Sequence, residues 1–188
     1  MDTIQAIFSR HSITNLRPDP VPHSLIEQLL AAAVQAPNHY NVRPWRFVVL
    51  QGPALERLGD VFAEALQAHL PNVDVPQAAL EKERAKARRA PLIIAVGVDR
   101  VDDPRAVPIE NICAVAAACE NLLLAAAALG LAGKWRTGSQ ALDERVKTFL
   151  GLDPQQPLIG FLYLGYPVDD QPVFGDRPSF RDRTLWMD

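Results

Sequence analysis

The sequence has few of the residues that bind structural metals or form disulfide frameworks. Its 188 residues include only two cysteines, Cys113 and Cys119, and four histidines, and none of these stands at a metal-ligand spacing. A structural zinc site is therefore disfavoured, and both cysteines are expected to be buried, unreactive thiols. A chain of this length forms one domain, and its core is large enough to fold by packing alone.

The sequence also lacks an excess of positive charge. Nineteen basic residues against twenty-two acidic ones give a formal net charge of -3, whereas a nucleic-acid-binding domain typically carries a basic surplus. The most basic run, EKERAKARR at residues 81–89, interleaves glutamates with its cations. That pattern is typical of a solvated helix face rather than of a phosphate-binding patch. We therefore expect no nucleic-acid partner and assign this run no function.

Targeting and membrane signals are weak. The first residues, MDTIQAIFSR, lack the basic start and apolar core of a secretory signal, so a cytoplasmic location is expected. Residues 112–133 are long and apolar enough to cross a bilayer. Glu120 and Asn121 stand near the middle of this segment, where a carboxylate in lipid would cost at least ~2.5 kcal/mol. An alanine-rich helix inside the protein is favoured, with no membrane partner.

Several common catalytic motifs are missing. No G-x-G-x-x-G follows a strand, and neither G-x-S-x-G nor H-E-x-x-H occurs, so a Rossmann nicotinamide site and the corresponding hydrolases have no support. The stretch ALGLAGKW imitates a phosphate-binding loop. Ala128 stands where that motif requires glycine, and Trp135 replaces the hydroxyl residue that would hold magnesium.

Hydrophobic periodicity predicts more helices than strands. Ser24 and Glu27 have the spacing of a capping box, which would begin the second helix. Helices are expected at about residues 3–9, 24–36, 54–69, 77–89, 109–129 and 142–150, and strands at 45–50, 91–98 and 158–164. Because helices and strands do not alternate strictly, the predicted class is α+β.

The C-terminal residues differ from the rest of the chain. Residues 1–168 are expected to form the domain, and residues 169–188 an extended arm punctuated by prolines. The apolar side chains near the end of this arm cannot bury themselves on one another. They must lie along a partner or along the chain's own domain.

Three polar clusters are candidates for a functional site. Arg10, His11 and Ser12 follow the first helix. Arginine offers a bidentate fork and serine a further hydrogen bond, as a phosphate monoester requires. Arg10 could equally complement the negative end of that helix.

The second cluster is the segment APNHYNVRPWRF, residues 36–47. His39 and Asn41 can each donate and accept hydrogen bonds to a polar planar ligand, or the segment is a turn whose hydrogen bonds are satisfied internally. The third cluster, GKWRTG at residues 133–138, is expected to be a loop. Its cations, its hydroxyl and its glycines suit close approach to a ligand, and an ordinary connecting loop would accept them equally well.

The order of these motifs is more specific than any one of them. The chain contains RHS near its start, AP-x-x-x-N-x-x-PW-x-F about thirty residues on, a long alanine-rich segment, G-x-WR-[ST]-G, and finally GFLYLGYP. Over nearly its whole length, the sequence resembles the nitroreductase-like FMN flavoprotein family, and within it the small NAD(P)H nitroreductases. The resemblance implies an α+β homodimer with a central antiparallel sheet surrounded by helices. FMN would lie at the subunit interface, and the C-terminal arm would be exchanged between subunits.

Carried onto this sequence, the resemblance assigns residues to the cofactor site. The positions implied to bind FMN are Arg10, His11, Ser12, Gln35, His39, Asn41, Trp135, Arg136 and Thr137. Gln35 stands where close relatives have arginine, and Thr14 stands where some larger relatives carry a flavin-binding lysine. The larger members have an additional helical segment over the flavin, for which this chain is too short.

The implied activity is that of an FMN-dependent oxidoreductase. It would take hydride from NAD(P)H and reduce nitroaromatic, quinone or similar electron-poor acceptors by a ping-pong mechanism. The flavin N5 carries this chemistry, so no catalytic protein nucleophile is needed. The alternatives are a non-catalytic flavin-binding protein and a flavin-consuming or dehalogenating member of the same fold.

Overall fold

Four antiparallel strands form the middle layer of the described structure. The computed structural model describes residues 1–168 and 177–187. The strands are β1 (Trp45–Gln51), β2 (Leu92–Val98), β3 (Ala132–Arg136) and β4 (Leu158–Gly165). Their order is β1-β2-β4-β3, with antiparallel pairing between all neighbours. The two apolar strands β2 and β4 are therefore central, and β3 lies at an edge.

Each face of the sheet carries its own hydrophobic core. Successive side chains of a strand point to opposite faces, and β2 follows this rule: Ile94 and Val96 belong to one core, whereas Ile93 and Ala95 belong to the other. All seven residues of β2 are buried. This explains why the strand reads as a continuous apolar run rather than as an alternating one.

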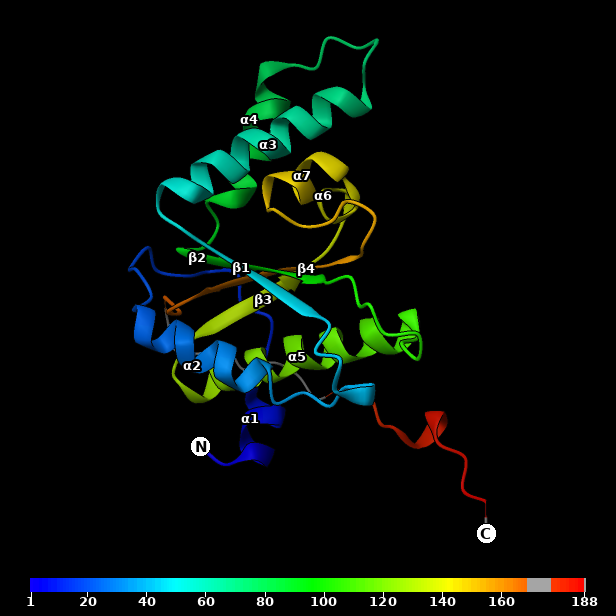
Figure 1. Cartoon of the computed structure of the whole chain (residues 1–188). Helices are drawn as coiled ribbons and strands as arrows, with labels where there is room; N and C mark the ends of the chain where they lie inside the picture. Colours follow the sequence, from blue (N-terminus) through cyan, green and yellow to red (C-terminus); the bar gives the residue numbers. More distant parts are fainter. Residues whose placement is uncertain (169–176, 188) are drawn as a thin grey trace.

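Helices cover both faces of the sheet, as Figure 1 shows. One face packs against α2 (His23–Ala33) and α5 (Pro108–Ala128), and α1 (Thr3–Ser9) lies against α5. The other face is covered by α3 (Pro53–His69), α4 (Gln77–Ala87), α6 (Ser139–Leu142) and α7 (Glu144–Phe149). Two short 3-10 helices, η1 (His39–Asn41) and η2 (Arg181–Arg183), complete the described elements. The α+β class with a central antiparallel sheet is thus confirmed.

The alanine-rich helix α5 is part of the core. Val115, Ala118 and Leu122 are fully buried in the cluster that also contains residues of β2 and β4. By length and composition alone, α5 could cross a membrane. Its packing against the sheet and α2 agrees with the expected buried helix instead.

The same helix corrects one expectation about the cysteines. Cys119 is fully buried, but Cys113 is exposed. Six positions on a helix correspond to roughly 600°, or 240° beyond a full turn. Since only one face of α5 is directed into the core, the two side chains have different environments.

Three other local expectations were wrong. Helix α2 begins at His23 with Pro22 as its N-cap and has no side-chain cap, so Ser24 lies inside the helix and forms no capping box. In place of one helix at residues 142–150, α6 ends at Leu142 and α7 runs from Glu144 to Phe149, and the Asp143 carboxylate between them caps α7 by accepting from Arg145 N and Val146 N. The third cluster is mostly the strand β3 rather than a loop, because it pairs with β4.

The charged run of α4 largely pairs with its neighbours. Arg84 lies 2.9 Å from Asp60 and Arg88 lies 3.0 Å from Glu56, and both carboxylates belong to α3. The helix ends at Ala87, two residues earlier than expected. Pro91 disfavours helical backbone in the residue before it, and β2 begins immediately afterwards. Arg89 therefore lies off the helix, in the connection to the sheet.

Apolar side chains are exposed on α1 and near the C-terminus. On α1, Ile4, Ile7 and Phe8 stand at the i, i+3, i+4 spacing of one helix face, and they are 62%, 45% and 76% exposed. Leu185 and Trp186 are 83% and 78% exposed in a segment that extends away from the layered body (Figure 1). Of the expected arm, residues 169–176 and 188 lie outside the described residues. The apolar end of the arm is not buried on its own domain.

We predict that Cys119 resists thiol reagents in the folded protein. Burial, reinforced by the charge of Glu120, raises the pKa of the Cys119 thiol to about 12, and the reactive species is the thiolate. In a Cys113→Ser variant, labelling with a disulfide reagent near pH 8 should occur only after the chain is unfolded with denaturant. Rapid labelling of the native variant would show that this face of α5 is open.

Candidate functional site

A short backbone pairing joins the first and third polar clusters. Ser12 forms a parallel bridge with Gly133 at the start of β3, and Ile13 N donates to Gly133 O at 3.0 Å. Residues 10–13 therefore run beside the edge of the sheet. A Cβ at position 133 would lie 2.6 Å from Leu164 Cδ2 and would also collide with the carbonyl oxygen of Tyr163. The glycine thus permits the close pairing of β3 with β4, and this edge strand in turn carries the pairing with Ser12.

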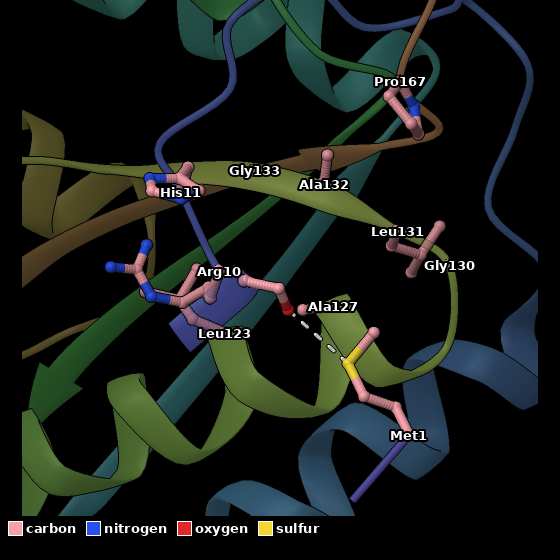
Figure 2. A pocket seen from close by; sticks show the side chains of 11 residues that line it. Met1, Arg10, His11, Leu123, Ala127, Gly130, Leu131, Ala132, Gly133 and Pro167 are labelled. Carbon is pink, nitrogen blue, oxygen red and sulfur yellow. Dashed lines mark hydrogen bonds between the residues drawn. The ribbon is translucent and has the colours of Figure 1, made fainter. Parts of the chain in front are cut away.

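Arg10 and His11 line a cavity of about 270 Å³ between α5 and β3. Figure 2 shows both side chains together with Leu123, Ala127 and the residues from Gly130 to Gly133. The Arg10 guanidinium lies 3.4 Å from a Glu120 carboxylate oxygen, and the Arg10 carbonyl accepts from Arg177 Nη2 at 3.3 Å. Two arginines from opposite ends of the sequence are therefore in contact, although only Arg10 lines the cavity, and Ser12 is exposed beside Arg10 in the sequence.

The alternation of β3 separates the side chains of the third cluster. Trp135 packs against the core, and its indole Nε1 donates to Ile159 O at 3.2 Å. Arg136 points to the opposite face, where its guanidinium carbon lies 5.6 Å from the centre of the Tyr163 ring. Thr137 follows the strand and is exposed. Within this cluster, Arg136 and Thr137 are accessible to a ligand, whereas the Trp135 side chain is engaged in packing.

The second cluster lies elsewhere on the same chain. His39 Nδ1 is 2.7 Å from Glu110 Oε2, and its ring stacks on Tyr40 with ring centres 4.0 Å apart. Arg105 also packs on Tyr40, with its guanidinium carbon 4.2 Å from the centre of the Tyr40 ring. An open cavity of about 620 Å³ borders this group, and it is lined by Pro37, Asn38, His39, Glu110, Cys113, Ala114 and Ala117.

The loop that carries His39 has an unusual backbone. Tyr40, Asn41 and Arg43 have φ values of 51°, 56° and 51°, which is the left-handed region that residues other than glycine seldom adopt. Asn38 Oδ1 accepts from Arg43 N at 2.8 Å and holds the loop closed. Such backbone strain concentrates at functional sites. Gln35 is exposed between α2 and the loop, and its side-chain amide donates to Ala31 O in α2 at 3.3 Å.

The two groups of predicted site residues lie at opposite ends of α5. The second cluster borders α5 at Glu110–Ala117, whereas the first cavity borders it at Leu123 and Ala127. The α5 residues that contact the two clusters, Glu110 beside His39 and Glu120 beside Arg10, are ten positions apart, which corresponds to roughly 15 Å along a helix axis. The two cavities share no lining residue. Within one chain, the second cluster is not brought to the other two.

Several residues at these sites had no sequence signal of their own. Glu110 reaches His39 across 71 positions, and Arg177 reaches Arg10 across 167. Neither pairing follows from a local motif. Glu110 stands in the first turn of α5, where acidic residues are common for helix-dipole reasons alone, so its position did not indicate a site.

Comparison with known proteins agrees with this architecture. The chain matches the nitroreductase family over residues 7–166. It is 31% identical over 168 residues to "Putative NAD(P)H nitroreductase YdjA" of Escherichia coli K12, covering 89% of each chain. A nitroreductase-like family protein from Bacillus cereus has a similar crystal structure, with a TM-score of 0.82, 23% identity and coverage of 100% of this chain and 96% of the other.

A further solved structure is similar as well. It is a nitroreductase with bound FMN from Bacteroides fragilis NCTC 9343, which has a TM-score of 0.73, 21% identity and full coverage of both chains. The present chain belongs to the nitroreductase family. This membership places it among the oxidoreductases, and the observed sheet and helices are those of the family fold.

We predict that Gly133→Ala destabilises the protein. The added methyl group would force β3 away from β4, and overpacking of this kind typically lowers the free energy of unfolding by about 1–3 kcal/mol. Urea denaturation of the two proteins measures the difference. Equal midpoints and slopes would show that the pairing of β3 with β4 tolerates a side chain at this position.

Proposed function

We propose that this chain is an FMN-dependent oxidoreductase that takes hydride from NAD(P)H and passes electrons to nitroaromatic, quinone-like or similar acceptors by a ping-pong mechanism. The observation that carries the proposal is the pairing of Ser12 with Gly133. It unites the RHS segment with the WRT segment, two of the three motifs that the family resemblance assigns to FMN. The FMN-bound relative and the printed name of the Escherichia coli relative agree with this assignment.

The residues at the first cavity fit a phosphate-bearing cofactor. Arg10 lines the cavity, Arg177 adds positive charge beside it by donating to the Arg10 carbonyl, and the exposed Ser12 hydroxyl is available as a donor. A charge-assisted hydrogen bond contributes about 1.5–3 kcal/mol, so three such bonds approach the ~8 kcal/mol of micromolar binding before association costs. Bound FMN would supply hydride acceptance and transfer. The chain's own residues would hold the cofactor and orient it.

A homodimer would complete the site. The second cluster lies at the far end of α5 from Arg10, and a two-fold axis can place one subunit's cluster against the other subunit's first cavity. The exposed Ile4, Ile7 and Phe8 on α1 and the exposed apolar residues near the C-terminus support such an interface. Exchange of the C-terminal arm is part of this proposal.

His39 would then act from the neighbouring subunit. Because Nδ1 faces the Glu110 carboxylate at 2.7 Å, the proton of the neutral imidazole is held on Nδ1. Nε2 is left as an acceptor for a donor group of the ligand. Asn41, held two residues further along the strained loop, can both donate and accept. Gln35 would contribute an amide at the same edge.

The location of the protein is a further part of the proposal. The described cysteines are both free, which suits the reducing cytoplasm. A protein of this kind would meet small aromatic or quinone-like acceptors there.

The non-catalytic and flavin-consuming alternatives predict a different response to nicotinamide nucleotides, so one experiment separates them from the reductase.

That experiment is anaerobic reduction of the purified chain. We expect a yellow protein whose flavin absorption is bleached by NADH or NADPH and restored by a quinone or nitroaromatic acceptor, with parallel lines in double-reciprocal plots. A flavin band that neither nucleotide bleaches would favour a binding protein or a specialised reaction. A colourless protein that takes up no added FMN would contradict the proposal.

We predict that Arg10→Ala weakens FMN binding by roughly 10–100-fold, the equivalent of one or two charge-assisted hydrogen bonds. The matched control is Glu120→Gln, which removes the partner of Arg10 at 3.4 Å but leaves the cation. Fluorescence titration of the flavin-free proteins with FMN measures both. If Arg10→Ala binds FMN as tightly as the wild type, the first cavity does not hold the phosphate.

A further inference from the structure

A second cavity lies on the other side of the segment that pairs with β3. It measures about 270 Å³ and is lined by Ile13, Thr14, Leu16, Arg89, Lys134, Arg136 and Tyr163. Three of these seven residues are cations, and none is acidic. Lys134 and Arg136 are two positions apart on β3 and therefore point to the same face. Arg89 comes from the connection between α4 and β2.

These cations have no anionic partner within the described part of the chain. Fourteen ion pairs involve other residues, and none of them includes Arg89, Lys134 or Arg136. Glu83 is the acidic residue whose charge acts on Tyr163. Its carboxylate is already occupied, since it accepts from Lys86 at 2.6 Å and from Gln140 at 2.7 Å. The cavity therefore concentrates positive charge that the described residues leave uncompensated.

The hydroxyl groups of Tyr163 and Thr14 add hydrogen-bond donors to this cavity. Tyr163 lies directly opposite Lys134 across the β3–β4 ladder, and Thr14 lines the same cavity. Burial raises the pKa of the Tyr163 hydroxyl to about 12, so the group keeps its proton and can donate at neutral pH. Cations that line a partly enclosed space attract anions more strongly than cations on an open surface, because solvent screens them less.

We propose that this second cavity is an anion site, in which Arg89, Lys134 and Arg136 bind a ligand group that carries negatively charged oxygens. Its volume is slightly below the range of ~300–1,000 Å³ typical of whole-ligand pockets. It would therefore hold one anionic end of a larger molecule, or a single oxyanion. The site also gives a role to Lys134 and Arg89, which the FMN assignment leaves unused.

Two sources could supply such a group. One is the FMN of the proposed function, whose ring carries oxygens and gains negative charge on reduction. In that case, Lys134 and Arg89 would supply, from β3 and the α4–β2 connection, the charge that Thr14 does not provide. The other source is a phosphate, either free or part of a nicotinamide nucleotide. FMN and the nicotinamide nucleotide both belong to the proposed function, whereas binding of free phosphate does not depend on it.

The test uses the full chain after flavin has been washed out, with inorganic phosphate as the probe in titration calorimetry. The background is Arg10→Ala, so that phosphate bound at the first cavity does not contribute. Lys134→Met and Arg89→Met should each weaken phosphate binding about tenfold, which corresponds to about 1.4 kcal/mol. Lys82→Met, which removes an exposed lysine of α4 outside the cavity, should leave it unchanged. Arg89 is exposed, so its variant should fold even if an edge-strand substitution does not.

The outcome with FMN present distinguishes the two sources. If FMN fills the cavity, saturation with FMN abolishes phosphate binding, and Lys134→Met weakens FMN binding as well. If the cavity holds a separate anion, phosphate still binds to the FMN-loaded protein. Phosphate binding that is absent, or that is unaffected by both substitutions, overturns the anion site. The proposed function would survive that result, provided that the wild-type protein retains FMN and NAD(P)H bleaches it.

Discussion

The backbone pairing between Ser12 and Gly133 is the contact on which the candidate site depends. A single parallel bridge, with the Ile13 N to Gly133 O hydrogen bond of 3.0 Å, extends the sheet beyond its edge strand. It places Arg10 on one side of that edge and the Lys134 and Arg136 side chains on the other. Together with the bridge between Leu16 and Pro167 and the hydrogen bond from Arg17 N to Tyr166 O at 2.8 Å, it fixes the N-terminal segment beside β3.

Helix α5 imposes the second constraint. It is a rigid core helix, and it holds the His39 loop at one end and the Arg10 cavity at the other. The contacts of His39 with Glu110 and of Arg10 with Glu120 are separated by roughly 15 Å along this helix. The proposed homodimer would bring the two groups together from different chains, and the apolar residues left exposed on α1 and near the C-terminus support such an interface.

Sequence patterns predicted the elements whose signals are local. The apolar runs of β2 and β4 and the apolar positions of α3 and α5 were sufficient, because burial on both faces or along one stripe appears directly in the residue order. The pattern failed at β3, where glycines suggested a loop but pairing with β4 determines the structure. It also failed for Cys113, because the sequence does not show which face of an apolar helix is covered.

The site itself could be predicted only in part. The ordered motifs indicated Arg10, Ser12 and Arg136, which the structure brings to one edge of the sheet. They did not indicate Glu110, Arg177 or Arg89, whose roles depend on contacts between distant segments. The alternation of β3 had a similar effect, since it turns Trp135 into the core and Lys134 toward a cavity. The family resemblance had instead assigned Trp135 to the cofactor and had left Lys134 without a role.

The most direct test of this account is complementation between two inactive variants. Arg10→Ala and His39→Ala should each impair FMN retention and NAD(P)H oxidation when produced alone. If each site combines Arg10 of one subunit with His39 of the other, a mixed dimer contains one intact site. Random pairing in a co-expressed mixture should then restore about a quarter of the wild-type sites. No recovery, despite confirmed mixed dimers, would mean that the two residues do not serve a shared site, and it would contradict the account.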